Sequence, residues 1–522
     1  MKSVLLSSLC SLCLCGELFG QEPVSGTLVI VGGGKLPASV RDEFVKRAGG
    51  PSKAKIVVIP TASESADKPE EAESYLAAWR KYEPAALTLL HKPDAAGLKP
   101  LAEATGVWLS GGDQSRLTAA YKGKPVEAEL NAVLKRGGVV GGTSAGAAVM
   151  SDPMITGGNP EATTGPGFGF LPGVVVDQHF TQRKRLPRLQ GLLEKQPGFA
   201  GLGIDESTAL VVSGRTIRVV GEGTVTACWA KSADRPARVD VLKPGDTLDL
   251  FQVRRAAQAR ATPAPPIGTP EVAKGSLVIV GGGAVPPVIV ERFLTLAGGK
   301  DAPILVIPTA QDDPLAADHP EAELFRRHGA TNVAVLHTRD RKTADAPPFA
   351  KPLSSAKGVW FGGGRQWRFV DAYEGTLTLV AVRGVLERGG VIGGSSAGAS
   401  IQGEYMPRGH PLGNTVVMAE GYERGFNFLP GVAVDQHFFK RNRFADMTGL
   451  MAKRPDLLGI GIDEATAVVV TGHTAEVIGA SKVAFYDYRS GKPAGDKDYV
   501  AVPAGGRYDL VARQPEAVSP TR

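Results

Sequence analysis

The strongest constraint on the fold is that the chain contains the same ordered series of motifs twice. We expect the copies to be two domains, at residues 24–255 and 276–513. A repeat of about half of a 522-residue chain is too long for one turn of a solenoid and fits tandem domains of ordinary size. The repeated segments begin at these positions: LVIVGGG at 28 and 277, VIPTA at 58 and 306, WLSGGDQ and WFGGGRQ at 108 and 360, GGTSAG and GGSSAG at 141 and 393, VDQHF at 176 and 434, and GIDE at 203 and 461.

The segments outside the two copies have compositions of their own. Residues 256–275 are rich in Ala and Pro, which predicts an extended linker. Residues 1–20 carry one lysine and a short apolar run, which is typical of a secretory signal peptide and predicts a secreted or periplasmic protein. A lipoprotein signal around Cys13 and Cys15 is an alternative, whereas a membrane span would need a longer apolar run. Without residues 1–20 the chain keeps only Cys228, so it has no internal disulfide.

Each copy alternates short apolar runs, which end at Gly or Pro, with stretches compatible with helices, such as residues 70–81 and 126–136. This alternation predicts an α/β fold with a mostly parallel sheet and helices on both faces. The last part of each copy, residues 216–253 and 474–511, has a β-rich pattern with turn signals. In such folds the functional residues lie in loops at the carboxyl ends of the strands.

Each copy also contains a G-x-S-x-G segment after an apolar run, with Ser144 in the first and Ser396 in the second. A strand, a sharp turn and a helix of small residues together lift a serine hydroxyl clear of a sheet. The backbone N–H of the next residue, Ala145 or Ala397, then faces the place where negative charge develops on an acyl oxygen. One such match is common by chance, but two in matching surroundings predict nucleophiles.

A serine hydroxyl needs a base, and the base needs an acid that orients it. His179 and His437 stand at equivalent positions between the serine and the end of each copy. Glu206 and Glu464 each follow that histidine by 27 residues (206 − 179 and 464 − 437), and we prefer them as the acids. Three further acids are alternatives for this role: Asp205, Asp463 and Asp177.

Four motifs in one order, GGDQ, GTSAGA, DQHF followed by spaced arginines, and GIDE, resemble the cyanophycinase family. This family consists of serine peptidases related to aspartyl dipeptidases, with the flavodoxin-like fold of class I glutamine amidotransferases. The resemblance covers both copies and implies the release of β-aspartyl-arginine from cyanophycin, a poly-aspartate whose side chains carry arginine. It implies two triads: Ser144, His179 and Glu206, and Ser396, His437 and Glu464.

The arginines that follow each histidine indicate an acidic substrate independently of the resemblance, because guanidinium groups pair with carboxylates in a bidentate way. A solvated basic helix face would have the same sequence. The resemblance assigns substrate binding to Gln114, Asp177, Arg183, Arg185 and Arg188, and to Gln366, Asp435, Arg441 and Arg443. The glycine pair of GGDQ leaves room for an oxyanion contact, which adds Gly112 and Gly364 to Ala145 and Ala397.

The second copy differs in charge at two of these places. Asp446 stands where the first copy has Arg188, and Arg365 stands where it has Asp113. One cation is thereby replaced by an anion. We expect the second domain to be the weaker one on cyanophycin.

Two other functions are compatible with these motifs: an aspartyl or isoaspartyl dipeptidase with the same triad, and a non-catalytic peptide-binding repeat protein. The net charge of +6 is modest and spread along the chain, which argues against nucleic-acid binding. No His or Cys cluster has the spacing of metal ligands, and we expect no cofactor. We expect an acidic peptide or poly-aspartate substrate, no stable membrane span, and packing of the two domains as an intramolecular pseudo-dimer.

Overall fold

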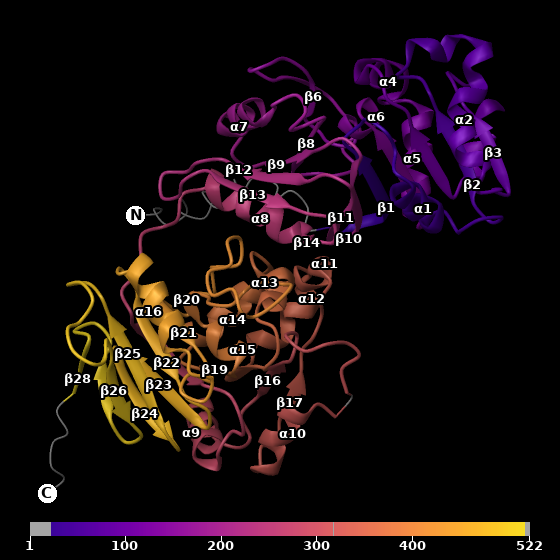
Figure 1. Ribbon diagram of the computed structural model, residues 1–522. Helices are drawn as coiled ribbons and strands as arrows, with labels where there is room; N and C mark the ends of the chain where they lie inside the picture. Colours follow the sequence, from indigo (N-terminus) through magenta and orange to yellow (C-terminus); the bar gives the residue numbers. More distant parts are fainter. Residues whose placement is uncertain (1–21, 95, 317, 517–522) are drawn as a thin grey trace, which may run out of the picture. The chain divides into compact units, whose positions relative to one another are not determined.

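The computed structural model describes residues 22–94, 96–316 and 318–516. The predicted signal peptide, residues 1–20, lies outside the described residues. The chain divides into two compact units, Met1–Ala264 and Pro265–Arg522. Each unit is an α/β structure (Figure 1).

The main sheet of the first unit has eight strands in the order β14-β11-β10-β1-β5-β4-β2-β3. One half is parallel and consists of β1 (Val24–Val31), β5 (Val139–Thr143), β4 (Gly106–Leu109), β2 (Lys55–Ile59) and β3 (Ala86–Leu89). The other half is antiparallel and consists of β10 (Thr208–Gly214), β11 (Thr216–Gly221) and β14 (Thr247–Asp249). The expectation of a mostly parallel sheet therefore describes only one half of it.

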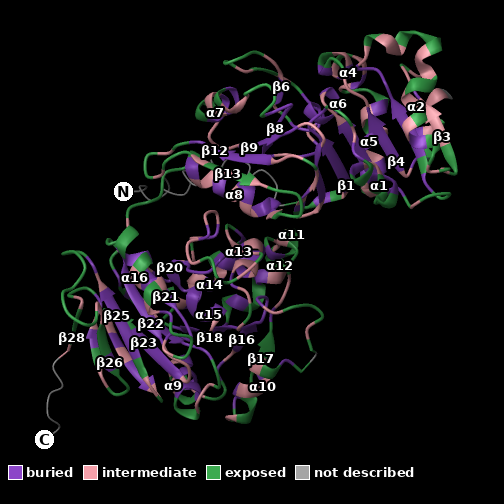
Figure 2. Cartoon of the chain, viewed as in Figure 1, coloured by how far each residue is buried: buried purple, intermediate pink, exposed green. Residues whose placement is uncertain are grey.

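A second sheet of four strands, in the order β13-β12-β9-β8, carries the later motifs. Its strands are β13 (Arg238–Leu242), β12 (Val225–Trp229), β9 (Ala200–Ile204) and β8 (Val174–Gln178), and only β8 and β9 are parallel. A hairpin of β6 (Met154–Gly157) and β7 (Thr163–Gly165) precedes them. Apolar residues of both sheets share one core, and their central strands are buried (Figure 2).

Helices cover both faces of the main sheet, and β1 shows why. Its side chains alternate between the faces, so Val29 and Val31 pack with Phe44 on one side, whereas Leu28 and Ile30 pack with Leu130 on the other. The helices of the unit are α1 (Ala38–Arg47), α2 (Ala72–Arg80), α3 (Lys99–Glu103), α4 (Gln114–Tyr121), α5 (Pro125–Lys135), α6 (Ala145–Ala148), α7 (Leu186–Lys195) and α8 (Leu250–Ala261), with 3₁₀ turns at Glu64–Asp67, Pro69–Glu71 and Ala96–Leu98.

The second unit repeats this plan with a main sheet of nine strands in the order β17-β16-β18-β19-β15-β23-β24-β27-β28. These are β15 (Val272–Val280), β16 (Ile304–Ile307), β17 (Val333–Val335), β18 (Gly358–Phe361), β19 (Val391–Ser395), β23 (Thr466–Gly472), β24 (Thr474–Gly479), β27 (Arg507–Asp509) and β28 (Gln514–Pro515). The other sheet, β20-β21-β22-β25-β26, consists of β20 (Gly403–Tyr405), β21 (Leu429–Asp435), β22 (Leu458–Ile462), β25 (Lys482–Asp487) and β26 (Val500–Pro503). Its helices are α9 (Pro287–Ala297), α10 (Pro320–Arg327), α11 (Arg341–Ala344), α12 (Pro347–Ala350), α13 (Trp367–Tyr373), α14 (Leu377–Glu387), α15 (Ala397–Ser400) and α16 (Phe444–Lys453), with a 3₁₀ turn at Lys351–Ser354.

The predicted linker, residues 256–275, is too long at both ends. Helix α8 continues to Ala261 because Asp249 caps its first turn and because Ala256 and Ala257 are good helix formers that bury against the core. Arg260 is also buried and donates to the carbonyls of two residues before the helix, Ala230 and Pro236. Strand β15 begins at Val272, which leaves residues 262–271 outside these two elements.

Candidate active site

Ser144 lies in the turn between β5 and α6 with φ 51° and ψ −109°, and Ser396 lies between β19 and α15 with φ 56° and ψ −111°. Positive φ is uncommon for a residue with a side chain, and such strain is found most often at functional sites. The turn also requires glycine at 142, since a Cβ there would lie 2.4 Å from the carbonyl oxygen of Gly146. The sharp turn expected from G-x-S-x-G is therefore present in both units.

Three successive carbonyl groups at the end of the first strand of each unit hold the backbones of the segments that carry the predicted triad. In the first unit the pairs are Val31 O with Ser144 N–H (3.0 Å), Gly32 O with His179 N–H (2.7 Å) and Gly33 O with Ser207 N–H (2.9 Å). In the second unit they are Val280 O with Ser396 N–H (3.1 Å), Gly281 O with His437 N–H (2.6 Å) and Gly282 O with Ala465 N–H (2.9 Å). The repeated LVIVGGG motif thus fixes all three segments at once.

The side chains then form an unbroken hydrogen-bonded chain. In the first unit Ser144 Oγ lies 2.8 Å from His179 Nε2, and His179 Nδ1 lies 2.6 Å from Glu206 Oε1. The corresponding distances in the second unit are 2.9 Å and 2.6 Å. With its proton on Nδ1, the imidazole donates to the glutamate, and its Nε2 is free to accept the serine proton.

The alternative acids are engaged elsewhere. Asp205 accepts hydrogen bonds from the backbone and hydroxyl groups of Thr181 and Thr224. Asp463 accepts from Lys440 N–H and Ser481 Oγ. Asp177 is buried against arginines. Of the candidate acids, all of which are described, Glu206 and Glu464 are the ones that contact Nδ1 of the histidines, as the preferred assignment requires.

The electrostatic state of the histidine suits a base. Burial of the imidazole, opposed by its hydrogen bond to Glu206, holds the pKa of His179 below its usual 6.5, and the nearby Arg183 lowers it further. Burial likewise lowers the pKa of His437. Both imidazoles are therefore neutral at pH 7.

The expected oxyanion donors are also close to the nucleophile. A Cβ on Gly111 would lie only 3.4 Å from Ser144 Cβ, so the backbone of the glycine pair passes beside the serine. Gly112 has φ 141°, and a Cβ there would lie 2.1 Å from the carbonyl oxygen of Ala62, which excludes any side chain. Within the described residues, no acceptor is hydrogen-bonded to the backbone N–H of the four expected donors, Gly112, Ala145, Gly364 and Ala397.

Comparison with known proteins agrees with this geometry. Peptidase family S51 matches the chain twice, at residues 28–220 and 277–478. The chain belongs to peptidase family S51. It is a serine-type peptidase with two tandem copies of the family's domain.

Curated relatives of one copy are cyanophycinases. The protein from Geminocystis herdmanii is 35% identical over 219 residues, which cover 41% of this chain and 80% of the relative. The relative from Synechococcus elongatus is 36% identical over 224 residues, 41% of this chain and 68% of its own length, and that from Trichormus variabilis is 33% identical over 231 residues, 42% and 76%. Among solved structures, a peptidase from an acI-B1 Actinobacterium is 25% identical, covers 45% of this chain and 97% of its own, and has a TM-score of 0.35.

The arginines of the first S51 domain divide into two kinds. Arg188 is buried and binds both carboxylate oxygens of Asp177, which has no exposed surface, and Arg185 donates to Asp177 at 3.3 Å. Their charges are thus used inside the protein. Arg183 is exposed and lies close enough to lower the pKa of His179, so it is the most accessible of the three to a ligand.

The two predicted pocket glutamines are buried, and their amide nitrogens hold a neighbouring loop. Gln114 Nε2 donates to the carbonyls of Ile155 and Thr156 at 2.9 and 3.0 Å. Gln366 Nε2 donates to those of Pro407 and Arg408 at 2.8 and 3.0 Å. These contacts also identify Thr156 and Arg408 as equivalent positions.

The cation that position 446 lacks is supplied from another segment of the second domain. Arg408, supplied by a different segment, contacts both oxygens of Asp435 at 3.2 Å and Asp446 at 2.6 Å, while Arg443 contacts Asp435 at 2.7 Å. The cation has moved from position 446 to position 408. Sequence reasoning missed it because the equivalent position in the first copy, Thr156, carries no charge and lies in none of the repeated motifs.

Two arginines of the second domain, Arg441 and Arg365, remain to be placed. Arg441 is exposed at the position of Arg183 and also lowers the pKa of its histidine, His437. Arg365 donates to the carbonyls of His410 and Gly413, so it holds a loop.

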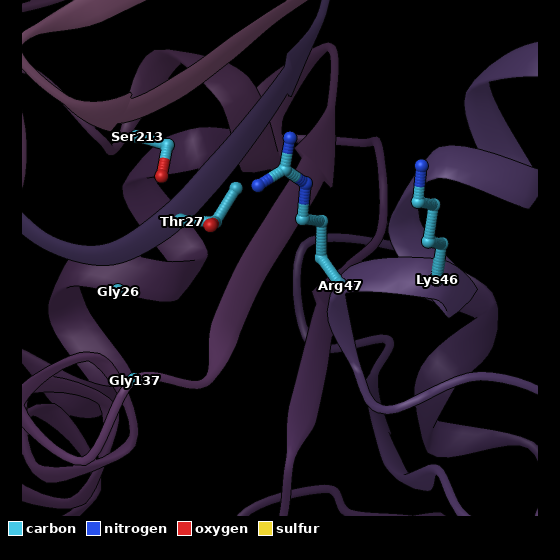
Figure 3. Close-up of a pocket in the computed structure, with 6 residues that line it drawn as sticks. All are labelled: Gly26, Thr27, Lys46, Arg47, Gly137 and Ser213. Carbon is cyan, nitrogen blue, oxygen red and sulfur yellow. The ribbon is translucent and has the colours of Figure 1, made fainter.

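A pocket of about 590 Å³ in the first unit lies apart from the triad (Figure 3). It is lined by Gly26, Thr27, Lys46, Arg47, Gly137 and Ser213. Gly26 and Thr27 begin β1, whereas the triad lies past the other end of that strand. Over residues 22–516, apart from 95 and 317, no group of three or more His, Cys, Asp or Glu could hold a metal ion, and no helix has the length and apolarity needed to cross a membrane.

Acylation of Ser144 should lose rate on acidification only below pH 6.5. Protonated His179 cannot accept the serine proton, and burial keeps its pKa under that value. The measurement is the rate of fluorophosphonate labelling of Ser144 in a Ser396→Ala chain, from about pH 4 to pH 8. A midpoint above 6.5 would contradict the assignment of the neutral imidazole as the base.

Replacing Arg408 by Met should destabilise the second domain by about 3 kcal/mol, because the change leaves a buried carboxylate short of a partner. Hydrogen exchange of the full chain, followed for peptides of β21 and β22, measures the effect. Thr156→Met in the first domain is the matched control, and we expect it to leave exchange in β8 and β9 unchanged. Combining Arg408→Thr with Asp446→Arg should restore protection, and failure of this pair would argue against an exchanged cation.

Proposed function

We propose that the protein is an exported cyanophycinase in which both S51 domains hydrolyse the polymer to β-aspartyl-arginine dipeptides. The observation that carries the proposal is the Ser-His-Glu geometry, which is the same in the two units to within 0.1 Å at the serine–histidine contact, 2.8 against 2.9 Å. The names of the curated relatives support the choice of substrate.

The proposed reaction begins when Ser144 Oγ attacks the substrate carbonyl carbon and His179 Nε2 takes the hydroxyl proton. Glu206 holds the imidazole and stabilises the positive charge that it acquires. The N–H groups of Gly112 and Ala145 stabilise the oxyanion. The imidazolium then gives its proton to the leaving amine, and water attacks the acyl-enzyme by the same route in reverse. In the second domain the same roles belong to Ser396 as nucleophile, His437 as base, Glu464 as orienting acid, and Gly364 and Ala397 as oxyanion donors.

The proposed substrate is acidic at the places that the site can contact. Each side chain of the polymer ends in the free carboxylate of an arginine. Arg183 is exposed near His179, and Arg441 is its counterpart near His437. Guanidinium groups bind carboxylates in a bidentate way, so we assign the two arginines to these carboxylates. We assign a structural role, shaping the floor of the substrate pocket, to two ion-paired sets: Arg185, Arg188 and Asp177 in the first domain, and Arg443, Arg408 and Asp435 in the second.

Three finer expectations belong to the same proposal. We propose the class I glutamine amidotransferase-like fold for each domain and a secreted or periplasmic location directed by residues 1–20. We also propose that the two domains form a pseudo-dimer.

Release of dipeptides from purified cyanophycin should continue in a Ser144→Ala chain and in a Ser396→Ala chain, and should stop in the double variant. Loss of a nucleophile costs on the order of 10⁴-fold or more in rate. Products are read by mass. The weaker second domain stays a prediction, and greater residual activity in Ser144→Ala than in Ser396→Ala would show it to be wrong.

β-Aspartyl dipeptides serve as the comparison substrate in the same assay. Cleavage of these dipeptides without cleavage of the polymer would replace the proposal by the dipeptidase alternative. Activity that survives in the double variant would contradict the assignment of the nucleophiles.

A further inference from the structure

Among the described residues, a half-buried glutamate that the catalytic chain does not use lies beside the second site and has no counterpart beside the first. Glu321 is in the first turn of α10, and its Oε1 accepts a hydrogen bond from Gly363 N–H at 2.9 Å. Its Oε2 is buried and has no partner among the described residues. A carboxyl group in this position needs an explanation, because an unpaired buried polar atom is costly.

Gly363 connects this carboxyl group to the nucleophile. A Cβ built on Gly363 would lie 3.7 Å from Ser396 Cβ and 3.9 Å from Glu321 Oε1, so the serine and the glutamate flank the same peptide. The next residue, Gly364, is the expected oxyanion donor. Glu321 therefore lies behind the peptide segment that faces the reacting carbonyl.

The first domain lacks this arrangement. The aromatic clusters align Phe325 with Trp79, which places Tyr75 at the position of Glu321. The Tyr75 hydroxyl donates to Ser63 Oγ at 2.8 Å, and no carboxylate among the described residues accepts a hydrogen bond from the N–H of Gly111.

A second difference makes room for the glutamate. The second domain has Gly362 where the first has Ser110. A Cβ on Gly362 would lie 2.5 Å from Glu321 Oε2. Glutamate at 321 and glycine at 362 thus form a matched pair.

No described cation neutralises this carboxyl group. On its own helix, the backbone N–H of Glu321 donates to His319 Nδ1, and Glu323 pairs with Arg326. Burial raises the pKa of Glu321 to about 7, and the single hydrogen bond from Gly363 lowers it only in part. The charged groups on the neighbouring elements are engaged with other partners: Asp312 with Arg368, Asp313 with His337 and Arg339, Arg365 with loop carbonyls, and His437 with Glu464.

We propose that Glu321 is a positioning residue of the second site, which fixes the Gly363–Gly364 peptide from behind and permits full activity only while its carboxyl group is neutral. This inference rests on the proposed function. The neutral carboxyl group accepts from Gly363 N–H and adds no charge. The carboxylate makes the same contact, but its charge opposes the negative charge that develops on the substrate oxygen.

The test compares the two sites separately, in a Ser144→Ala chain and a Ser396→Ala chain, each with and without Glu321→Gln. The rate of fluorophosphonate labelling is followed from about pH 5.5 to pH 8.5, on both sides of the usual neutral range. Labelling of Ser396 should fall at least about tenfold with rising pH, the effect of a unit charge within about 10 Å at an effective dielectric constant of about 20. Glu321→Gln should remove the fall, and labelling of Ser144 should not change with that substitution.

Two further variants keep the result interpretable. Glu323→Gln, on the same helix, is the control and should leave the profile of Ser396 unchanged. Glu321→Tyr with Gly362→Ser introduces the pair of the first domain and should also remove the fall. Two results would overturn the inference. One is a labelling rate of Ser396 that still falls with rising pH in the Glu321→Gln chain. The other is a labelling rate of Ser396 that stays constant with pH once His437 is deprotonated. Labelling of neither serine in any chain would overturn the proposed function and this inference with it.

Discussion

The candidate active site of each domain depends on the hydrogen bond between a glycine carbonyl and the backbone N–H of the proposed catalytic histidine, Gly32 to His179 and Gly281 to His437. This bond joins the two sheets, because the glycine follows the first strand of one and the histidine follows a strand of the other. The neighbouring carbonyls hold the serine and glutamate segments in the same way. The next glycine must also lack a side chain, since a Cβ on Gly33 would lie 2.2 Å from His179 Cε1.

Much of this site could be predicted from the sequence because its parts are local and repeated. Ser144 is recognised by the strand, turn and helix around it, and Glu206 by a spacing from His179 that recurs in the second copy. The role of GGG after the first strand could not be read in this way. The sequence indicates only a tight turn there, whereas the structure shows carbonyl groups that accept from three distant segments.

Ion pairs between residues from different segments were the part of the site that the sequence predicted least well. The family resemblance assigns Arg185 and Arg188 to substrate contacts, yet both donate hydrogen bonds to the carboxylate of Asp177. Asp446 suggests a lost cation, yet Arg408 supplies one from the position that Thr156 has in the first domain. The buried ion pair is thus kept in both domains with a different residue. The surroundings of the proposed oxyanion donors, in contrast, differ at Tyr75 and Glu321, so the two domains share the Ser-His-Glu geometry but differ in the charges around it.

The central claim is that each domain holds its own serine nucleophile, activated by its own histidine. The most direct measurement is the stoichiometry of fluorophosphonate labelling of the full chain near pH 6, with the modified residues located by mass. The account predicts two groups per chain, at Ser144 and Ser396, and loss of the first alone in a His179→Ala chain. Labelling of neither serine in folded protein, or labelling of Ser144 that continues without His179, would contradict it.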